Sequence, residues 1–191
     1  YLIRLNSINN YNLIVLTLWS FKLGKSKLIL ALIFCVVPIL SINAAEYRLG
    51  LSMHDVERRI EGGAALSIEK IFDRPEWWHP YAGRPHLGTH ISLANNTHLL
   101  YAGSTWNLFQ KGKFSGELAF GAALHSGEDE IKKNELGFGC SVNFREMIAF
   151  GYQIAENRVL QISAQHMSNG SLCDPNQGLT SVGLRLAWKI N

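Results

Sequence analysis

The stretch Phe114-Ser115-Gly116-Glu117-Leu118-Ala119-Phe120-Gly121-Ala122-Ala123-Leu124 carries the pattern that decides the fold. Large apolar residues recur here at even-numbered positions, whereas the odd-numbered positions hold only serine, glutamate, alanine and glycine. Successive side chains of a β-strand point to opposite faces, so this stretch predicts a strand with one large apolar face and one small or polar face.

The same alternation recurs along the chain after residue 45, with very little at helical period. Eight further runs show it: 47–53, 62–72, 87–93, 99–108, 136–144, 148–154, 159–165 and 184–190. In a soluble sandwich the large side chains would fill a core between two sheets. In a membrane barrel they would face lipid, and small or polar side chains would fill a narrow lumen. Because the second face is so small, the pattern favours the barrel.

The length of the chain fits an all-β, antiparallel, up-and-down transmembrane barrel of eight strands, since each strand needs roughly 10 residues. Nine runs exceed the even strand number that single-chain bacterial barrels have. We therefore expect two runs to merge around Arg145-Glu146, or one run not to cross the membrane. Trp188 lies three positions before the end of the chain, so the usual terminal aromatic residue is missing.

The N-terminal region predicts a secretory signal peptide over residues 22–45. Three lysines precede the apolar run 28–40, and small residues follow at 41–45, which is the order of a basic region, a hydrophobic segment and a cleavage site. The apolar run has 13 residues, whereas a membrane-spanning helix needs about 20. Residues 1–21 precede this pattern and are expected to be a leader or an untranslated segment. The barrel domain is then 46–191.

Charge and cysteine content limit the classes of function. The chain carries a formal net charge of +3, but residues 1–45 hold four basic residues and no acidic one, so residues 46–191 carry about −1. A nearly neutral domain has no broad basic surface for nucleic acid. Two cysteines remain in the domain, Cys140 and Cys173, and the sequence leaves their pairing open.

The aromatic segment 73–81 and the histidines give weaker indications of function. The segment 73–81 is rich in aromatic residues and proline, and it fits either a membrane interface or a packed loop. The spacing of the histidines matches no metal motif: His86 and His90 would need a helix to converge, and the alternation around them predicts a strand. The sequence predicts neither a metal site nor a cofactor.

His166 and Ser168 form the strongest candidate for catalysis. They follow the apolar run 159–165 and share a strand face with Leu160 and Ile162. Residues two apart on one strand face are roughly 7 Å apart at Cα, so the imidazole can reach the hydroxyl as its general base. If Leu160 and Ile162 face lipid, this pair also lies on the membrane side of the barrel.

The segment His166-Met167-Ser168-Asn169-Gly170-Ser171-Leu172-Cys173-Asp174-Pro175-Asn176-Gln177-Gly178 resembles the signature of the lipid A 3-O-deacylase family of outer-membrane barrels, the PagL type. That signature combines His-x-Ser-Asn with a downstream Pro-Asn-x-Gly. The segments 50–56, 87–88 and 101–103 are also similar to this family. The resemblance covers most of residues 46–191 and implies an esterase that removes the acyl chain at the 3-position of lipid A.

The resemblance also implies roles for individual residues. Ser168 would be the nucleophile and His166 its base, and Asn169 with the backbone N–H of Gly170 would form the oxyanion hole. The family has a glutamate that orients the histidine at the position of Thr180. A threonine hydroxyl can accept the histidine N–H, but it brings no negative charge. Asp174 is the nearest alternative acid, and the acidic loop residues Glu128, Asp129 and Glu130 are more distant candidates.

Two further functions stay open at this stage. A non-catalytic barrel with a structural or adhesive role fits the missing acid at Thr180, and a phospholipase of similar architecture fits the Ser-His pair. The expected partners are lipid A or lipopolysaccharide as substrate and the lipid of the bacterial outer membrane, with a homodimer as a further option.

Overall fold

The computed structural model describes residues 46–79, 81–94 and 96–189. The predicted leader at 1–21 and signal peptide at 22–45 lie outside the described residues. Eight strands follow one another along the chain: β1 (Glu46–His54), β2 (Gly63–Ile71), β3 (Arg84–Ser92), β4 (Leu99–Lys111), β5 (Phe114–His125), β6 (Val142–Ala155), β7 (Arg158–Ser168) and β8 (Leu179–Lys189).

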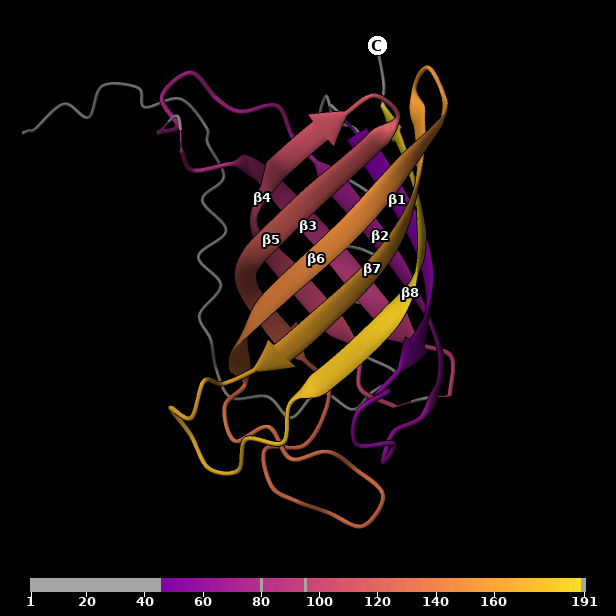
Figure 1. Ribbon diagram of the computed structural model, residues 1–191. Helices are drawn as coiled ribbons and strands as arrows, with labels where there is room; N and C mark the ends of the chain where they lie inside the picture. The colour runs from indigo at the N-terminus through magenta and orange to yellow at the C-terminus, as the bar shows by residue number, and fades with distance from the viewer. Residues whose placement is uncertain (1–45, 80, 95, 190–191) are drawn as a thin grey trace, which may run out of the picture.

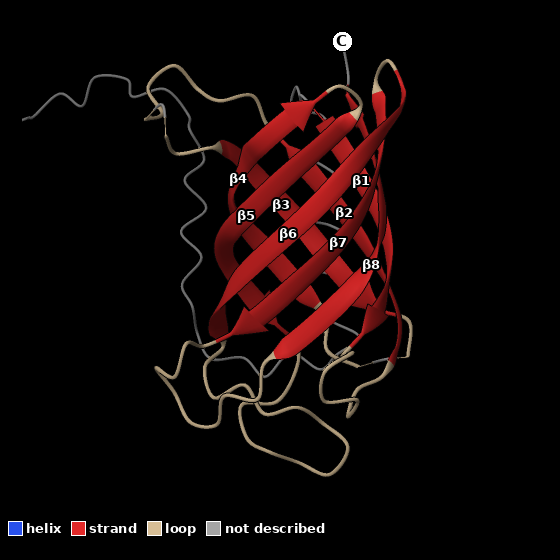
Figure 2. Ribbon diagram, in the orientation of Figure 1, coloured by secondary structure: helices blue, strands red, loops and turns tan. Residues whose placement is uncertain are grey.

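The eight strands form one closed, antiparallel, up-and-down barrel (Figures 1 and 2). Each strand pairs with its neighbour in sequence, and β8 pairs with β1 to close the sheet. Closure satisfies the backbone hydrogen bonds of every strand, which a membrane-spanning sheet requires. The predicted fold class is confirmed. Among the described residues, no helix is long and apolar enough to cross a membrane.

The excess ninth run has a clear physical explanation. β6 runs without interruption through Arg145 and Glu146, so the predicted merger at these residues is confirmed. Residues 136–141 were expected to be part of a strand but lie in the loop between β5 and β6. Leu136 and Phe138 do not face lipid as strand residues would. Both side chains turn into the barrel and are almost fully buried.

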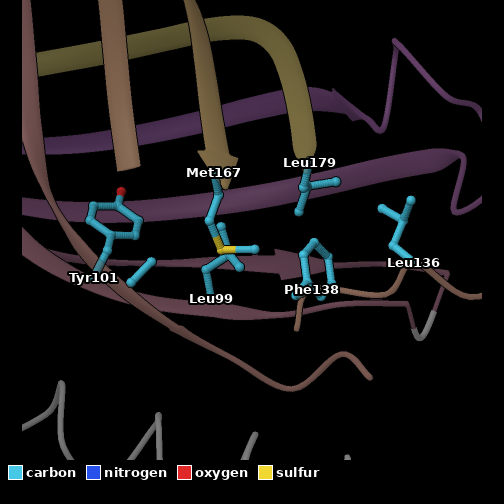
Figure 3. Close-up of a cluster of buried hydrophobic side chains, with 7 residues drawn as sticks. Leu99, Tyr101, Leu136, Phe138, Met167 and Leu179 are labelled. Atoms are coloured by element: carbon cyan, nitrogen blue, oxygen red, sulfur yellow. The ribbon is translucent and has the colours of Figure 1, made fainter. Parts of the chain in front are cut away.

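A hydrophobic cluster therefore fills one end of the barrel. Leu136 and Phe138 of the loop pack there with side chains from four strands (Figure 3). The members from the strands are Leu99, Tyr101, Ala123, Met167 and Leu179. Because the strand residues come from both early and late strands, this cluster fixes the loop against the wall that carries the C-terminal motif.

The two faces of the wall are as the alternation predicts. The side chains of Leu118, Phe120 and Phe144 are 40%, 47% and 41% exposed and point away from the barrel. The lumen instead holds buried charges: Arg48 donates to Glu69 and also to carboxylates from β1 and β5. A soluble sandwich would bury the large residues, so the apolar outer surface assigns this barrel to a lipid environment.

The connections at the two ends of the barrel differ in length. The connections at 55–62, 93–98, 126–141 and 169–178 lie at one end, which we call the loop end (Figure 1). The other end carries the two-residue turns 112–113 and 156–157 and the aromatic segment 72–83. In that segment Trp77 and Tyr81 are strongly exposed, which favours the membrane interface over internal packing. Outer-membrane barrels have their longer loops on the cell exterior.

Candidate active site on the outer wall

Strand β7 brings His166 and Ser168 to the loop end of the barrel, on its outer face. Leu160 and Ile162 of the same face are 42% and 55% exposed, whereas His166 and Ser168 are half-buried. The apolar part of the strand thus faces lipid, and its last two outward positions are polar. A reactive group placed here is reached from the membrane and not from the lumen.

His166 and Thr180 meet across the β7–β8 pair. They are direct partners in the register, and His166 Nδ1 lies 2.8 Å from Thr180 Oγ1. Thr180, at the position where the resemblance places the orienting acid, therefore contacts His166.

A carboxylate that the sequence did not single out completes this contact. Thr180 Oγ1 donates a hydrogen bond of 2.6 Å to Glu57 Oε2. Glu57 lies in the turn that follows β1, and 123 positions separate it from Thr180 in sequence. Only closure of the barrel by the β1–β8 pair brings these two residues together. Local spacing therefore carries no signal for Glu57.

The other ring nitrogen of His166 lies beside Gly178. A Cβ atom added at Gly178 would lie 3.2 Å from His166 Nε2 and 2.8 Å from Cε1, so the ring packs against the glycine backbone. Gly178 immediately precedes Leu179, the register partner of Met167. Within the described residues, no hydrogen bond joins the Ser168 hydroxyl to His166.

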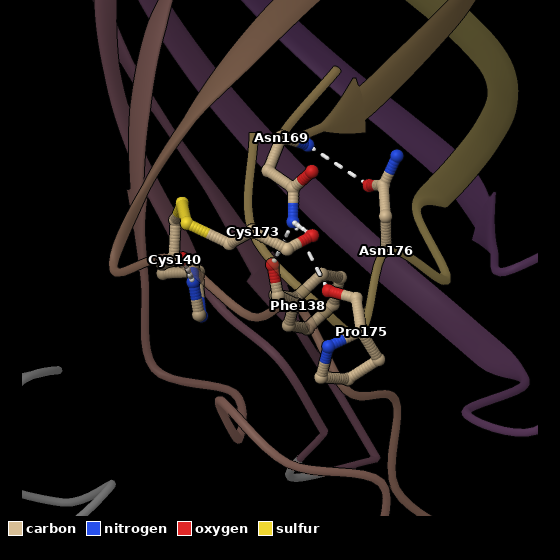
Figure 4. Close-up of a disulfide and its surroundings, with 7 residues drawn as sticks. Phe138, Cys140, Asn169, Cys173, Pro175 and Asn176 are labelled. Atoms are coloured by element: carbon tan, nitrogen blue, oxygen red, sulfur yellow. Dashed lines mark hydrogen bonds between the residues drawn. A yellow bond between two sulfur atoms is a disulfide. The ribbon is translucent and has the colours of Figure 1, made fainter. Parts of the chain in front are cut away.

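Asn169 has a different environment from the one that the resemblance implies. Its Nδ2 lies 2.7 Å from the carbonyl oxygen of Phe138 and 3.0 Å from those of Cys173 and Pro175 (Figure 4). Its backbone N–H donates to Asn176 Oδ1 at 3.0 Å. An amide NH₂ group has two hydrogens, and three carbonyls already surround it. The side chain of Asn169 thus braces the two loops, and its oxyanion role stays a prediction.

The backbone N–H of Gly170 is available as a donor. Among the described residues it has no hydrogen-bond partner, and it follows Ser168 by two positions in a turn with φ of +62°. A disulfide between Cys140 and Cys173, with Cα atoms 5.7 Å apart, links this turn region to the 126–141 loop. The disulfide settles the pairing that the sequence left open, and it fixes the loop that carries Gly170.

The other candidate acids do not reach the histidine. Asp174 is exposed, and in the described part of the chain no hydrogen bond or ion pair joins it to His166. Glu128 forms an ion pair of 2.6 Å with Lys132 in the 126–141 loop, and neither Asp129 nor Glu130 contacts His166 there. The role of Asp174 as a substitute acid stays a prediction.

Glu61 binds three loops together at the same end of the barrel. Its Oε2 accepts the backbone N–H of Thr97 at 2.7 Å, and its Oε1 accepts that of Leu136 at 2.9 Å. Burial alone would raise the pKa of Glu61, but the His54 ring, whose Nε2 lies 3.7 Å from Oε2, and the hydrogen bonds from these two residues lower it to about 2. The ionised carboxylate is thus part of the frame around the site.

The outer wall beside the site is apolar on both sides. Phe144 of β6 is the direct register partner of Ser168, and its ring stacks on Phe120 with centroids 5.9 Å apart. On the other side, an apolar groove lies over β7, β8, β1 and β2, and its lining includes Ile162, Val182 and Leu184. Val182 is only two positions from Thr180. The polar site thus opens onto surfaces suited to hydrocarbon chains.

Comparisons with known proteins agree with this architecture. A family profile described as "Lipid A 3-O-deacylase (PagL)" matches residues 42–189. A crystal structure of the outer membrane enzyme PagL superposes with a TM-score of 0.57 at 21% identity, covering 76% of this chain and 100% of that chain. Neisserial surface protein A (NspA) superposes with a TM-score of 0.55 at 8% identity, covering 76% and 96% of the respective chains. No protein with curated annotation matches significantly.

Proposed function

Because the chain belongs to the lipid A 3-O-deacylase (PagL) family, we propose that it removes the 3-O-linked acyl chain from lipid A by a Ser-His mechanism. The barrel belongs in the bacterial outer membrane, as its family and its apolar outer face indicate. The observation that carries the proposal is the position of His166 and Ser168, on the lipid-facing wall at the loop end. A substrate anchored in the bilayer reaches them there without leaving it.

In the proposed first half-reaction, Ser168 Oγ attacks the carbonyl carbon of the 3-O-ester. His166 Nε2 accepts the hydroxyl proton as the new bond forms. The negative charge that develops on the carbonyl oxygen is stabilised by the Gly170 N–H. When the tetrahedral intermediate collapses, the ester C–O bond breaks, and His166 returns the proton to the departing 3-hydroxyl oxygen of the sugar.

In the second half-reaction, water hydrolyses the acyl-enzyme. His166 takes a proton from the water, the hydroxide forms a bond to the acyl carbon, and Ser168 leaves with the proton returned. A fatty acid is released, and no cofactor enters the balance. The apolar surfaces on both sides of Ser168 support this chemistry, since they offer hydrocarbon contacts to the acyl chains of the substrate.

Mass spectrometry of lipid A from cells that express the chain tests the proposal. We expect the loss of one 3-hydroxyacyl mass with the natural chain, and no loss with Ser168→Ala. Purified phospholipid offered to the same preparations separates a lipid A deacylase from a phospholipase. Deacylation that survives Ser168→Ala would refute the mechanism, and cleavage of phospholipid alone would refute the substrate.

A further inference from the structure

Glu57 lies where a serine esterase of this kind needs a negative charge. Its carboxylate accepts a hydrogen bond of 2.6 Å from the Thr180 hydroxyl, and Thr180 Oγ1 lies 2.8 Å from His166 Nδ1. Both distances are normal for strong hydrogen bonds. The three residues thus form a continuous chain along the outer wall, from the loop after β1 to the end of β7.

The backbone around Glu57 fixes this contact. The preceding residue, Val56, donates its N–H to the carbonyl oxygen of Thr180 at 2.9 Å. The following residue, Arg58, donates its Nε to the carbonyl oxygen of Gln177. The segment 177–180 therefore holds the turn on both sides of Glu57. In Figure 1 the loop after β1 lies close to the start of β8 at the loop end.

Asp55 stabilises the same turn from within. Its side chain accepts the backbone N–H groups of Arg58 at 3.1 Å, Ile60 at 2.6 Å and Glu61 at 2.9 Å. Asp55 itself has φ of 49°, a left-handed conformation that aspartate tolerates better than most residues. Glu57 is exposed, but hydrogen bonds hold the backbone of its turn on both sides.

Hydrogen-bond chemistry fixes the direction of the chain. An ionised carboxylate can only accept, so the single hydroxyl hydrogen of Thr180 points to Glu57. Thr180 Oγ1 then offers only a lone pair to His166, and the imidazole must carry its proton on Nδ1. Nε2 is left unprotonated, on the side of the ring that lies beside Gly178. This is the tautomer that a general base for Ser168 needs.

We propose that Glu57 is a positioning residue that acts through Thr180 to hold His166 in its Nδ1–H form and to stabilise the imidazolium formed during catalysis. The inference rests on the proposed Ser-His mechanism. When His166 takes the Ser168 proton on Nε2, its Nδ1–H keeps donating to Thr180, and Thr180 keeps donating to Glu57. No proton passes from His166 to Glu57. The positive charge of the imidazolium is instead stabilised by the negative charge of the Glu57 carboxylate, two hydrogen bonds away.

One other carboxylate lies near His166 and serves as the competing candidate. Glu146 is the direct register partner of His166 on β6, and its side chain is exposed on the same outer face. In the described residues no hydrogen bond or ion pair joins it to the imidazole. A variant at Glu146 therefore tests whether proximity alone is sufficient, or whether the contact through Thr180 is required.

The experiment measures deacylation by the purified full chain in mixed micelles of lipid A and detergent, for Glu57→Gln, Thr180→Val and the double variant. We expect each single change to lower kcat at least tenfold, because the loss of a directly bonded triad acid costs about 10⁴-fold and this contact is one residue removed. KM should stay within about threefold. The double variant should be no slower than Thr180→Val alone, since both changes interrupt one chain.

Three controls accompany the series. Thr180→Ser keeps the hydroxyl and should retain most activity, whereas Glu146→Gln and the distant Glu156→Gln should stay within about twofold of the natural chain. Heat-dependent migration on a denaturing gel shows that each barrel is folded. The ¹⁵N shifts of the His166 ring give a readout that a structural role would not change: the Nδ1–H form should dominate in the natural chain and in Thr180→Ser, and lose its dominance in Glu57→Gln.

The outcomes separate the two proposals. If Ser168→Ala is inactive but Glu57→Gln is within twofold of the natural chain, the role of Glu57 is refuted and the Ser-His mechanism stands. Independent, multiplying effects of Glu57→Gln and Thr180→Val would also refute the role, as would a large loss in Glu146→Gln alone. If Ser168→Ala stays active, the mechanism itself fails.

Discussion

Replacing Asn169 with alanine separates a loop brace from an oxyanion donor. The Asn169 Nδ2 group is surrounded by the carbonyl oxygens of Phe138, Cys173 and Pro175, at 2.7, 3.0 and 3.0 Å. It has two hydrogens, so two of these bonds form at a time. At about 1 kcal/mol for each bond, and with partly buried carbonyls left without a donor, Asn169→Ala should destabilise the two joined loops by about 2–3 kcal/mol.

Amide hydrogen exchange measures this quantity locally. The N–H of Leu172 donates to the carbonyl of Asn169 at 3.2 Å, and the N–H of Gly139 donates to that of Asp129 at 2.9 Å, so the two amides report on the two loops. A loss of 2–3 kcal/mol corresponds to exchange that is about 30 to 150 times faster. Asn176→Ala removes only the acceptor for the Asn169 N–H and should give about a tenfold increase or less.

Activity should fall together with loop order, because the loops carry Gly170. If the brace is the whole role, the kcat of Asn169→Ala should recover at low temperature, where the loops close again. The opposite result would refute the reasoning: unchanged exchange of Leu172 and Gly139 with a kcat loss of 10²- to 10³-fold is what removal of an oxyanion donor produces.

Three further predictions concern the frame of the site. Gly178→Ala places a Cβ 2.8 Å from His166 Cε1 at a φ of +68°, so it should cost about 1 kcal/mol of stability in thermal unfolding and at least tenfold in kcat; an unchanged kcat would mean that the ring position does not matter. Reducing the Cys140–Cys173 disulfide, or replacing both cysteines with serine, should speed amide exchange in the 126–141 loop and leave the barrel folded on a denaturing gel; equal exchange in both forms would contradict the brace. The pKa of Glu61 is lowered from 4.5 to about 2, so the stability that its carboxylate contributes is complete above pH 4.5 and is lost as the pH falls toward 2. Amide exchange at Leu136 should therefore become faster over this range in the natural chain, and in Glu61→Gln it should be fast and independent of pH after correction for intrinsic rates. A natural chain without that response would refute the assignment.

Most of the fold could be predicted from the sequence because a barrel wall is a repeated local pattern. Each strand has to place large residues outward and small or polar residues inward, and residues such as Leu118 and Phe120 show this period without any knowledge of their neighbours. Leu136 and Phe138 show where the pattern misleads. Two apolar residues that alternate in a loop can fill the mouth of the barrel instead of facing lipid, and local periodicity does not distinguish the two cases.

The candidate site was predictable only along β7. His166 and Ser168 share a strand face, and that follows from their spacing alone. Their surroundings depend on contacts that span the chain: Asn169 is occupied by carbonyls from two loops, and Glu57 reaches Thr180 only because β1 closes on β8. No rule of spacing predicts which loop of a closed barrel will lie against which strand.

The position of Glu57 has a consequence for the acid of the site. A carboxylate at position 180 would be part of the barrel wall, whereas Glu57 lies in a turn and reaches the histidine only through a hydroxyl. A carboxylate placed at position 180 should make Glu57 unnecessary for the orientation of His166. Thr180→Glu would place a carboxylate directly opposite His166, so Glu57→Gln should then cost no more than about twofold in kcat, although it costs at least tenfold beside threonine. If Glu57→Gln is equally harmful in both backgrounds, the turn acts on the substrate or on the fold, and the charge that His166 needs comes from elsewhere.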